Sequence, residues 1–265
     1  MKLKNMLPVW EPPSSETANF MNRTILLLLV AGLLLTGVAS AQDYLEEPID
    51  SPGTITGRVV LNGEAPAPLK LLITKDVEVC GLGYRERVEV DVDENNGLKN
   101  VVVFIEDVPL GKAWSEASVE SSINQETCRF QPHIQVMRNG IDIDVINSDE
   151  TLHNIHAYEL IGRARKTLFN ISQPEMGPIA EVMDPTRGNQ ISLECDSHDF
   201  MQGWIFVTDN PYATVVDEHG IYELTDVPAG TYQVSVWHPR LGIQTKELVV
   251  NHHDSTESDF VFDIE

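Results

Sequence analysis

The sequence predicts an all-β fold of the sandwich type. Segments in which apolar and polar residues alternate, and short apolar runs rich in β-branched residues, are interrupted at short intervals by glycine, proline and asparagine. No long stretch of residues 42–265 has the period of an amphipathic helix. Many short strands with frequent turn signals are typical of β-sandwiches.

The predicted strands begin at residue 54. Residues 54–61 end at the turn pair Asn62-Gly63, and residues 87–92 alternate with a period of two until Asn95-Asn96-Gly97 interrupts them. Residues 100–105 form a short β-branched apolar run, as expected of a buried strand. Further strands are predicted at 133–137, 141–146, 154–159, 190–194, 203–207, 220–224, 231–237, 245–250 and 259–263.

The N-terminal segment has the pattern of a secretory signal peptide. Arg23 precedes an apolar run at residues 25–35, and small residues then lead to Ala39-Ser40-Ala41. We expect residues 1–41 to be removed after Ala41, with Met21 as the true start and residues 42–52 as a flexible tail. The apolar run is shorter than the roughly 20 residues of a membrane helix, so we expect no stable membrane span after cleavage. An uncleaved anchor stays the alternative, and either reading places the protein in the periplasm or cell envelope, or outside the cell.

The charge balance excludes some partners. The chain has 41 Asp and Glu residues against 18 Lys and Arg, a formal net charge of −23 at pH 7. Nucleic acid and anionic lipid surfaces are therefore poor partners, because like charges repel. A basic protein partner fits this charge, and so does a purely solubilising role.

The three cysteines, Cys80, Cys128 and Cys195, leave one thiol unpaired. In an oxidising compartment two of them are expected to pair. Cys195 opens a Cys-x2-His-x2-Met loop that continues to His198 and Met201. Soft thiolate and thioether ligands together with imidazole suit copper in both of its oxidation states.

Residues 128–207 resemble a small cupredoxin, and the similarity is greatest to the amicyanin and plastocyanin group. The residues that carry the resemblance are Phe130, Pro132, Asp149, His153-Asn154 and the loop Cys195–Met201. The resemblance implies a Greek-key β-sandwich that holds one type 1 (blue) copper ion. The implied ligands are His153, Cys195, His198 and Met201. By elimination, Cys80 and Cys128 are then assigned to a disulfide.

Two further positions follow from the same resemblance. Asn154 is implied to fasten the strand of the upstream ligand to the cysteine loop through side-chain hydrogen bonds. Ser197 stands where amicyanins carry proline, and its N–H is available to the Cys195 sulfur, so we predict a higher reduction potential than in a proline-bearing relative. His198 is expected on an exposed loop as the electron exit.

Alternatives remain open at several of these positions. The alternatives are that Cys195 is a disulfide partner, that Met201 is a core residue and that His156 is a ligand. The assignment given above is preferred to each of them. His133 is read as structural. The other histidines, His219, His238, His252 and His253, show no ligand spacing and are read as surface residues.

The flanking sequence resembles a second family, the carboxypeptidase regulatory-like (transthyretin-like) domain. Residues 217–224 and 227–234 carry its later signature, and residues 55–63 resemble its opening strand and turn. We therefore predict a smaller sandwich that is split into residues 53–112 and 209–265. The cupredoxin, residues 113–208, would be inserted between the two parts, since insertions at exposed loops are well tolerated. A plain tandem arrangement is the alternative.

The function predicted from these features is that of an exported single-electron carrier, not an enzyme. Its partner would be a redox protein such as a cytochrome or a dehydrogenase. A nitrite reductase or multicopper oxidase needs additional histidine ligand sets, and the sequence shows one cluster. A non-catalytic copper-binding or envelope binding module is the alternative function. The segment 160–188, with its basic residues Arg163, Arg165 and Lys166, is either a docking surface or an ordered loop.

Overall fold

The computed structural model describes residues 44–115 and 121–264, and it confirms the all-β fold class. In this part of the chain the only helix is α2 (Val77–Cys80), and every other element is a strand. None of the described elements is a helix long and apolar enough to cross a membrane. The expected signal peptide, residues 1–41, lies outside the described residues.

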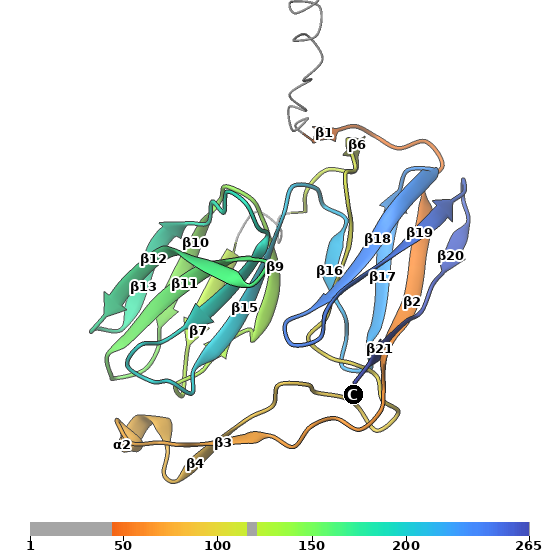
Figure 1. Cartoon of the computed structure of the whole chain (residues 1–265). Coiled ribbons are helices and arrows are strands. Elements are labelled where there is room, and N and C mark those ends of the chain that lie inside the picture. Colours follow the sequence, from red (N-terminus) through yellow and green to blue (C-terminus); the bar gives the residue numbers. More distant parts are fainter. Residues whose placement is uncertain (1–43, 116–120, 265) are drawn as a thin grey trace, which may run out of the picture. The chain divides into compact units, whose positions relative to one another are not determined.

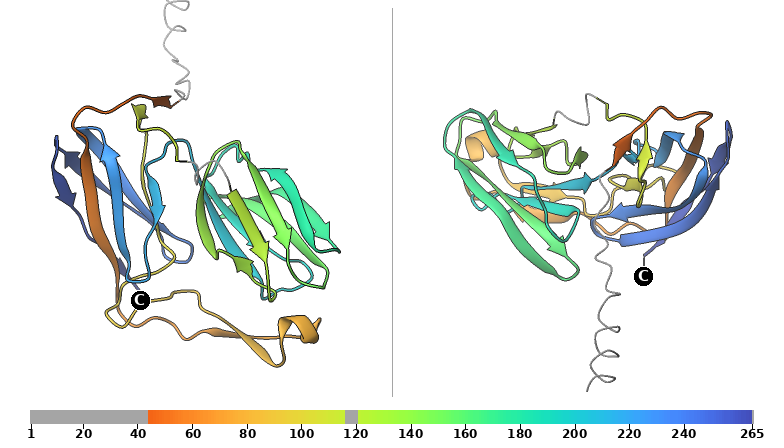
Figure 2. Two further views of the ribbon diagram at one scale, coloured as in Figure 1. Left: turned by 180° about the vertical axis from the view of Figure 1, so that it is seen from behind. Right: turned by 90° about the horizontal axis from the view of Figure 1, so that it is seen from above.

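Two sheets form the sandwich drawn in green in Figure 1. One has the order β13-β10-β7-β8 and the other β12-β11-β14-β15-β9, and Figure 2 shows the same strands from two further sides. The buried faces of both sheets meet in an apolar core that includes Ile123, Ile143, Ile155, Leu193 and Ile205. The strands are β7 (Ser121–Gln125), β8 (Phe130–Gln131), β9 (Ile134–Arg138), β10 (Asp142–Asn147), β11 (His153–Ile161), β12 (Ala164–Gln173), β13 (Gly177–Val182), β14 (Gln190–Glu194) and β15 (Gln202–Thr208).

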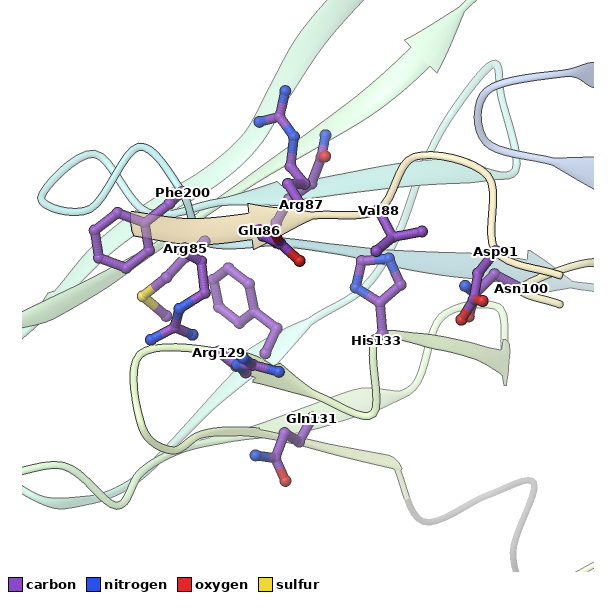
Figure 3. Close-up of a pocket in the computed structure, with 13 residues that line it drawn as sticks. Arg85, Glu86, Arg87, Val88, Asp91, Asn100, Arg129, Gln131, His133 and Phe200 are labelled. Carbon is purple, nitrogen blue, oxygen red and sulfur yellow. The ribbon is translucent and has the colours of Figure 1, made fainter. Parts of the chain in front are cut away.

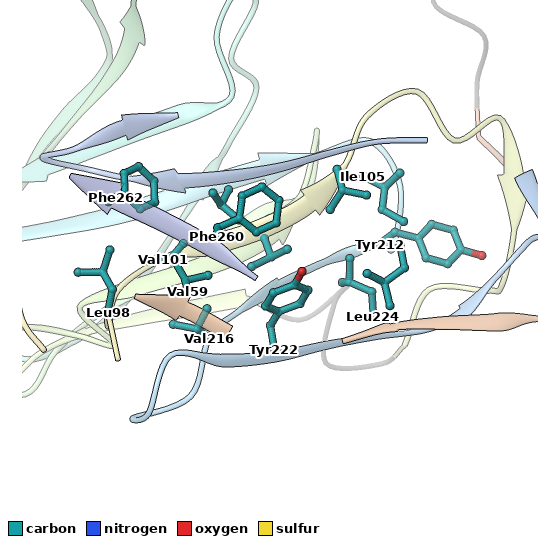
Figure 4. Packing of buried hydrophobic residues seen from close by; sticks show 14 of the residues in the cluster. Val59, Leu98, Val101, Ile105, Tyr212, Val216, Tyr222, Leu224, Phe260 and Phe262 are labelled. Atoms are coloured by element: carbon teal, nitrogen blue, oxygen red, sulfur yellow. The ribbon is translucent and has the colours of Figure 1, made fainter. Parts of the chain in front are cut away.

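A second sandwich is built from strands that precede and follow residues 121–208. Its sheets have the orders β16-β5-β18-β19 and β17-β2-β20, and β21 also pairs with β2. Figure 4 shows its core, in which Val59, Ile105, Tyr212, Leu224 and Phe260 pack together. The strands are β2 (Gly53–Asn62), β5 (Val102–Ile105), β16 (Ala213–Val215), β17 (Ile221–Val227), β18 (Gly230–His238), β19 (Gly242–Val250), β20 (Ser255–Glu257) and β21 (Phe260–Asp263).

The connection from β2 to β5 contains a hairpin that we call the arm, residues 69–87. It comprises β3 (Leu69–Leu72), helix α2 and β4 (Tyr84–Arg87), and β3 pairs with β4. A disulfide joins Cys80 of the arm to Cys128 in the turn between β7 and β8, which confirms the predicted pairing. Ile73 and Cys80 are buried in the core of the green sandwich.

Some strand predictions were wrong. The predicted strand 87–92 is not formed: β4 ends at Arg87, and Val92 makes only an isolated bridge with Leu98. The alternation there arises because Val90 is buried and Val92 packs against the core of the second sandwich from irregular backbone. The segment 160–188, expected as a connection, carries β12, which pairs with β11, and β13, which pairs with β10. Part of the expected flexible tail forms β1 (Leu45–Glu46), which pairs with β6 (Leu110–Gly111).

Candidate metal centre

The candidate site lies at one end of the five-stranded sheet of the green sandwich. His153 is the first residue of β11, and Cys195 directly follows β14. The loop after Cys195 closes the β14–β15 hairpin, in which Glu194 pairs with Gln202. Because β11 and β14 are hydrogen-bonded neighbours, His153 and Cys195 are brought to the same end of the sheet although 42 residues separate them.

Two consecutive turns shape the loop. The N–H of His198 donates to the Cys195 carbonyl at 3.2 Å, and the N–H of Met201 donates to the His198 carbonyl at 2.9 Å. Each turn advances the chain by three residues, so Cys195, His198 and Met201 are all buried while Asp196 and Asp199 are exposed. The Cys-x2-His-x2-Met spacing therefore matches the period at which this backbone turns inward.

Three potential ligand atoms form a compact triangle. The Nδ1 atoms of His153 and His198 are 3.1 Å apart, and the Cys195 Sγ lies 3.9 Å from the first and 3.6 Å from the second. A point equidistant from the three atoms lies about 2.1 Å from each, close to the roughly 2.0–2.3 Å of metal–nitrogen and metal–sulfur bonds. The triangle thus fits a metal ion in trigonal coordination by two nitrogens and one sulfur, the arrangement that copper adopts in blue electron-transfer sites.

Met201 is buried at the end of the same loop. A thioether there is of the type that serves as a weak axial ligand in trigonal sites made of two histidines and one cysteine. Its role as the fourth ligand stays a prediction, as do the roles of the other three residues.

Asn154 lies between the strand of His153 and the cysteine loop and makes contacts to both. Its Oδ1 accepts a hydrogen bond from the N–H of Ser197 at 3.2 Å and lies 3.4 Å from the Cys195 Sγ. Its own N–H faces the same sulfur at 3.5 Å, and its side-chain amide donates to Asn170 on β12 at 2.9 Å. One side chain therefore ties β11 to both the cysteine loop and the neighbouring edge strand.

Each histidine has a carboxylate behind it. The Nε2 of His153 lies 2.8 Å from Asp149 Oδ2, and the Nε2 of His198 lies 2.9 Å from Asp76 Oδ2 on the arm. A protonated Nε2 that donates to a carboxylate leaves Nδ1 with its lone pair, the form that binds a metal ion. Both carboxylates thus favour the tautomer that carries its proton on Nε2, which leaves the Nδ1 lone pair free on the side of Cys195.

The ionisation of the site is set mainly by burial. Burial raises the pKa of the Cys195 thiol, although the backbone N–H groups of Asn154, Ser197 and His198 partly oppose this. Burial also lowers the pKa of His153. The hydrogen bond from His198 lowers the pKa of Asp76. Metal binding to this set therefore displaces the thiol proton and meets a neutral imidazole.

The expected exposure of two histidines, His198 and His238, was wrong. His198 was expected on an exposed loop, but it is only 1% exposed because Asp76 and the loop itself cover it. His238 was read as a surface residue, yet it is 1% exposed and its Nδ1 accepts hydrogen bonds from the N–H groups of Arg240 and Leu241. His156 lies outside the triangle, where it stacks on Tyr158 and faces Asp196 at 3.1 Å.

The sequence did not predict the two carboxylates. Two signals could have indicated the contact of Asp149 with His153. Asp149 precedes His153 by four residues, and it already formed part of the cupredoxin resemblance. Asp76 is 122 residues from His198 and belongs to a segment to which no function was assigned. Only the folded arm brings it to the site.

A cavity of about 390 Å³ lies beside the site, between arm residues and the ligand loop (Figure 3). Arg85, Arg129 and Phe200 line it, and the Arg85 guanidinium lies 5.3 Å from the centroid of the Phe200 ring. None of His153, Cys195 and His198 lines this cavity. Met201, at the end of the ligand loop, does line it, so the cavity borders the site on the side of this residue.

Comparisons with known proteins return low similarities. No protein-family model matches the chain, and no curated protein matches it. Among solved structures, a purple cupredoxin from Nitrosopumilus maritimus is 17% identical with a TM-score of 0.29, over 34% of this chain and 100% of that one. Amicyanin from Paracoccus versutus is 14% identical with a TM-score of 0.28, over 40% of this chain and 97% of that one. The copper-containing nitrite reductase of Thermus scotoductus SA-01 is 16% identical with a TM-score of 0.26, over 34% of this chain and 22% of that one. Similarities this low do not assign the chain to a family.

Proposed function

We propose that this protein is an exported type 1 copper protein that carries single electrons in the periplasm or cell envelope, and that it is not an enzyme. The observation that carries the proposal is the triangle of His153 Nδ1, His198 Nδ1 and Cys195 Sγ, whose edges measure 3.1, 3.6 and 3.9 Å. Met201 is proposed as the axial ligand on the basis of its burial and its place in the loop. The whole set combines the soft and borderline ligands that copper prefers.

Bound copper would supply a one-electron couple, and the work of the protein's own residues is to hold a fixed geometry. Asn154 fixes the distance between β11 and the cysteine loop, while Asp149 and Asp76 hold the two imidazole rings from behind. A ligand set held in this way changes little between oxidation states, so little reorganisation opposes electron transfer. Burial of Cys195 and His198 keeps water away from the site.

The charge of the chain supports a basic redox partner, such as a cytochrome or a dehydrogenase. The net charge of −23 would attract such a partner over a distance of about one Debye length. The signal-like segment at residues 1–41 supports export. The second sandwich is proposed to be a regulatory-like domain that acts as a spacer or binding module.

A reductive titration of the copper-loaded protein tests the proposed function. An electron carrier takes up one electron per protein reversibly and exchanges it rapidly with a small basic redox protein such as cytochrome c. The same experiment with an acidic redox protein of similar potential is the control for electrostatic docking. A loaded protein that cannot be reduced, or that exchanges no electrons with either partner, would contradict the proposal.

A non-catalytic copper-binding module is the second candidate, and one observation favours it. His198 was expected to be the electron exit, and its Nε2 edge is covered by Asp76 at 2.9 Å. A module that only retains copper would bind the ion with the same spectrum but exchange electrons slowly. The rate of exchange therefore separates the two functions.

A further inference from the structure

The arm places a carboxylate on the ring of His198 from outside the sandwich. Asp76 directly precedes helix α2, and its Oδ2 lies 2.9 Å from His198 Nε2. The side chain of His198 has no exposed surface, whereas that of Asp76 is 42% exposed. Asp76 therefore forms the outer layer of the site at this point, between the ring and solvent.

The arm is anchored on both sides of Asp76. On one side Ile73 is buried in the core of the green sandwich. On the other side the Cys80–Cys128 disulfide fixes the end of α2. Arg85 adds a clamp, because its guanidinium donates to the carbonyls of Cys80 at 2.7 Å, Thr127 at 3.1 Å and Cys128 at 3.3 Å. The position of Asp76 is thus set by a covalent bond, a polar clamp and apolar burial.

The same anchor reaches the second histidine. The N–H groups of Thr127 and Cys128 donate to the carboxylate of Asp149 at 2.7 and 2.8 Å, and Asp149 Oδ2 faces His153 Nε2. The two disulfide sulfurs and a ring nitrogen of His198 all lie within 4.8 Å of one another. The disulfide therefore connects the backbone that carries one carboxylate to the backbone that orients the other.

We propose that the arm is a cover for the metal site and that Asp76 is a positioning residue, which holds the His198 ring with Nδ1 toward Cys195 and slows the release of copper. The part of the proposal that concerns copper release rests on the proposed function. Release of the ion would require His198 to rotate or shift outward, and the hydrogen bond that its Nε2–H donates to Asp76 opposes that motion. Carboxylates that orient a metal-binding histidine in this way typically contribute about 10- to 100-fold to metal affinity.

The first test uses the full-length protein without metal. Diethyl pyrocarbonate modifies accessible imidazole, and mass spectrometry gives the rate at each histidine. In the wild type His198 reacts far more slowly than the exposed His253. In Asp76→Ala the rate at His198 rises, and in Asp76→Asn, which keeps an acceptor oxygen in place, it stays low. Glu78→Ala is the matched control, because it removes an exposed carboxylate from helix α2, two residues after Asp76.

The second test uses the copper(I)-loaded protein and a chelator, bathocuproine disulfonate. Release from Asp76→Ala is expected to be about 10- to 100-fold faster than from the wild type, with Glu78→Ala unchanged. Equal modification of His198 in the wild type and Asp76→Ala would overturn the cover, and equal release rates would overturn the positioning role. A wild type that binds no copper would refute the proposed function instead, and the modification of His198 would still decide whether Asp76 covers the ring.

Discussion

Removal of the Cys80–Cys128 disulfide should destabilise the protein by an amount that follows from its position. The cross-link closes a loop of 48 residues. In the chain-entropy account, a loop of this length corresponds to about 4 kcal/mol of unfolding free energy at 25 °C. Both sulfurs are buried, so alanine at the two positions avoids leaving a buried hydroxyl without a partner.

The assay is urea unfolding of the metal-free protein, followed by tryptophan fluorescence. Cys80→Ala/Cys128→Ala should lose about 4 kcal/mol of the free energy of unfolding. Its slope with urea should also be steeper, because an unfolded chain without the cross-link exposes more surface. The wild type treated with a reductant should behave like the double variant.

Metal-free Cys195→Ala is the control, since it removes a cysteine of the same sandwich and leaves the disulfide intact. A loss below about 1 kcal/mol in the double variant would refute the reasoning. That result would mean that the unfolded chain keeps the arm close to residue 128 without the cross-link, or that the arm's other contacts carry its stability.

Three further predictions concern other positions. Ser197→Pro should lower the reduction potential measured by voltammetry, because it removes the N–H that donates to Asn154 Oδ1 and also favours the thiolate form of Cys195; an unchanged potential would contradict this. Gly57→Ala should destabilise the second sandwich by roughly 1–3 kcal/mol, because a Cβ at residue 57 would lie 2.0 Å from the Ser258 carbonyl oxygen; thermal melting compares it with Gly162→Ala, where the Cβ meets no atom within 4 Å and only the backbone strain at φ 60° remains. His238, whose pKa burial lowers to about 4, should make the protein less stable in acid.

The sign of the acid effect follows from which state binds more protons. The unfolded chain protonates His238 below about pH 6.5, whereas the folded protein does so only near pH 4. The contribution of His238 is therefore fully present above pH 6.5 and is lost between pH 6.5 and 4, up to about 3 kcal/mol. His238→Asn keeps an acceptor for the N–H groups of Arg240 and Leu241 and should reduce this acid dependence. An equal dependence in the variant and the wild type would contradict the assignment.

The ligand loop could be predicted from sequence because its geometry is local. Cys195, His198 and Met201 are spaced by one turn each, so backbone hydrogen bonds within seven residues suffice to bring them inward. His153 needed the resemblance to cupredoxins, since no local rule places it next to a residue 42 positions later.

Asp76 could not be predicted, for a physical reason. Its position depends on an arm that is anchored by one disulfide and by Arg85, and neither contact leaves a pattern in the residues around position 76. The disulfide itself was predicted, but it does not by itself show that Asp76 meets His198 122 residues away. Long-range contacts of this kind depend on how the loops pack.

The strand errors have a similar origin. Strand β12 lies at a sheet edge with most of its residues exposed, so the alternation that marks half-buried strands is weak there. Residues 87–92 do alternate, but Val90 and Val92 are covered by the second sandwich without a neighbouring strand to pair with along their length. Alternation indicates that one side of a segment is buried, and it does not indicate whether the backbone pairs with another strand.

The central claim is that Cys195 is a copper ligand, and visible absorption during titration with Cu(II) tests it most directly. The wild type should develop an intense thiolate-to-copper charge-transfer band that saturates at one equivalent. Cys195→Ser, in which a hydroxyl replaces the thiol, should show no such band. A wild type without the band, or a variant that retains it, would mean that the triangle of His153, Cys195 and His198 does not hold a type 1 copper ion.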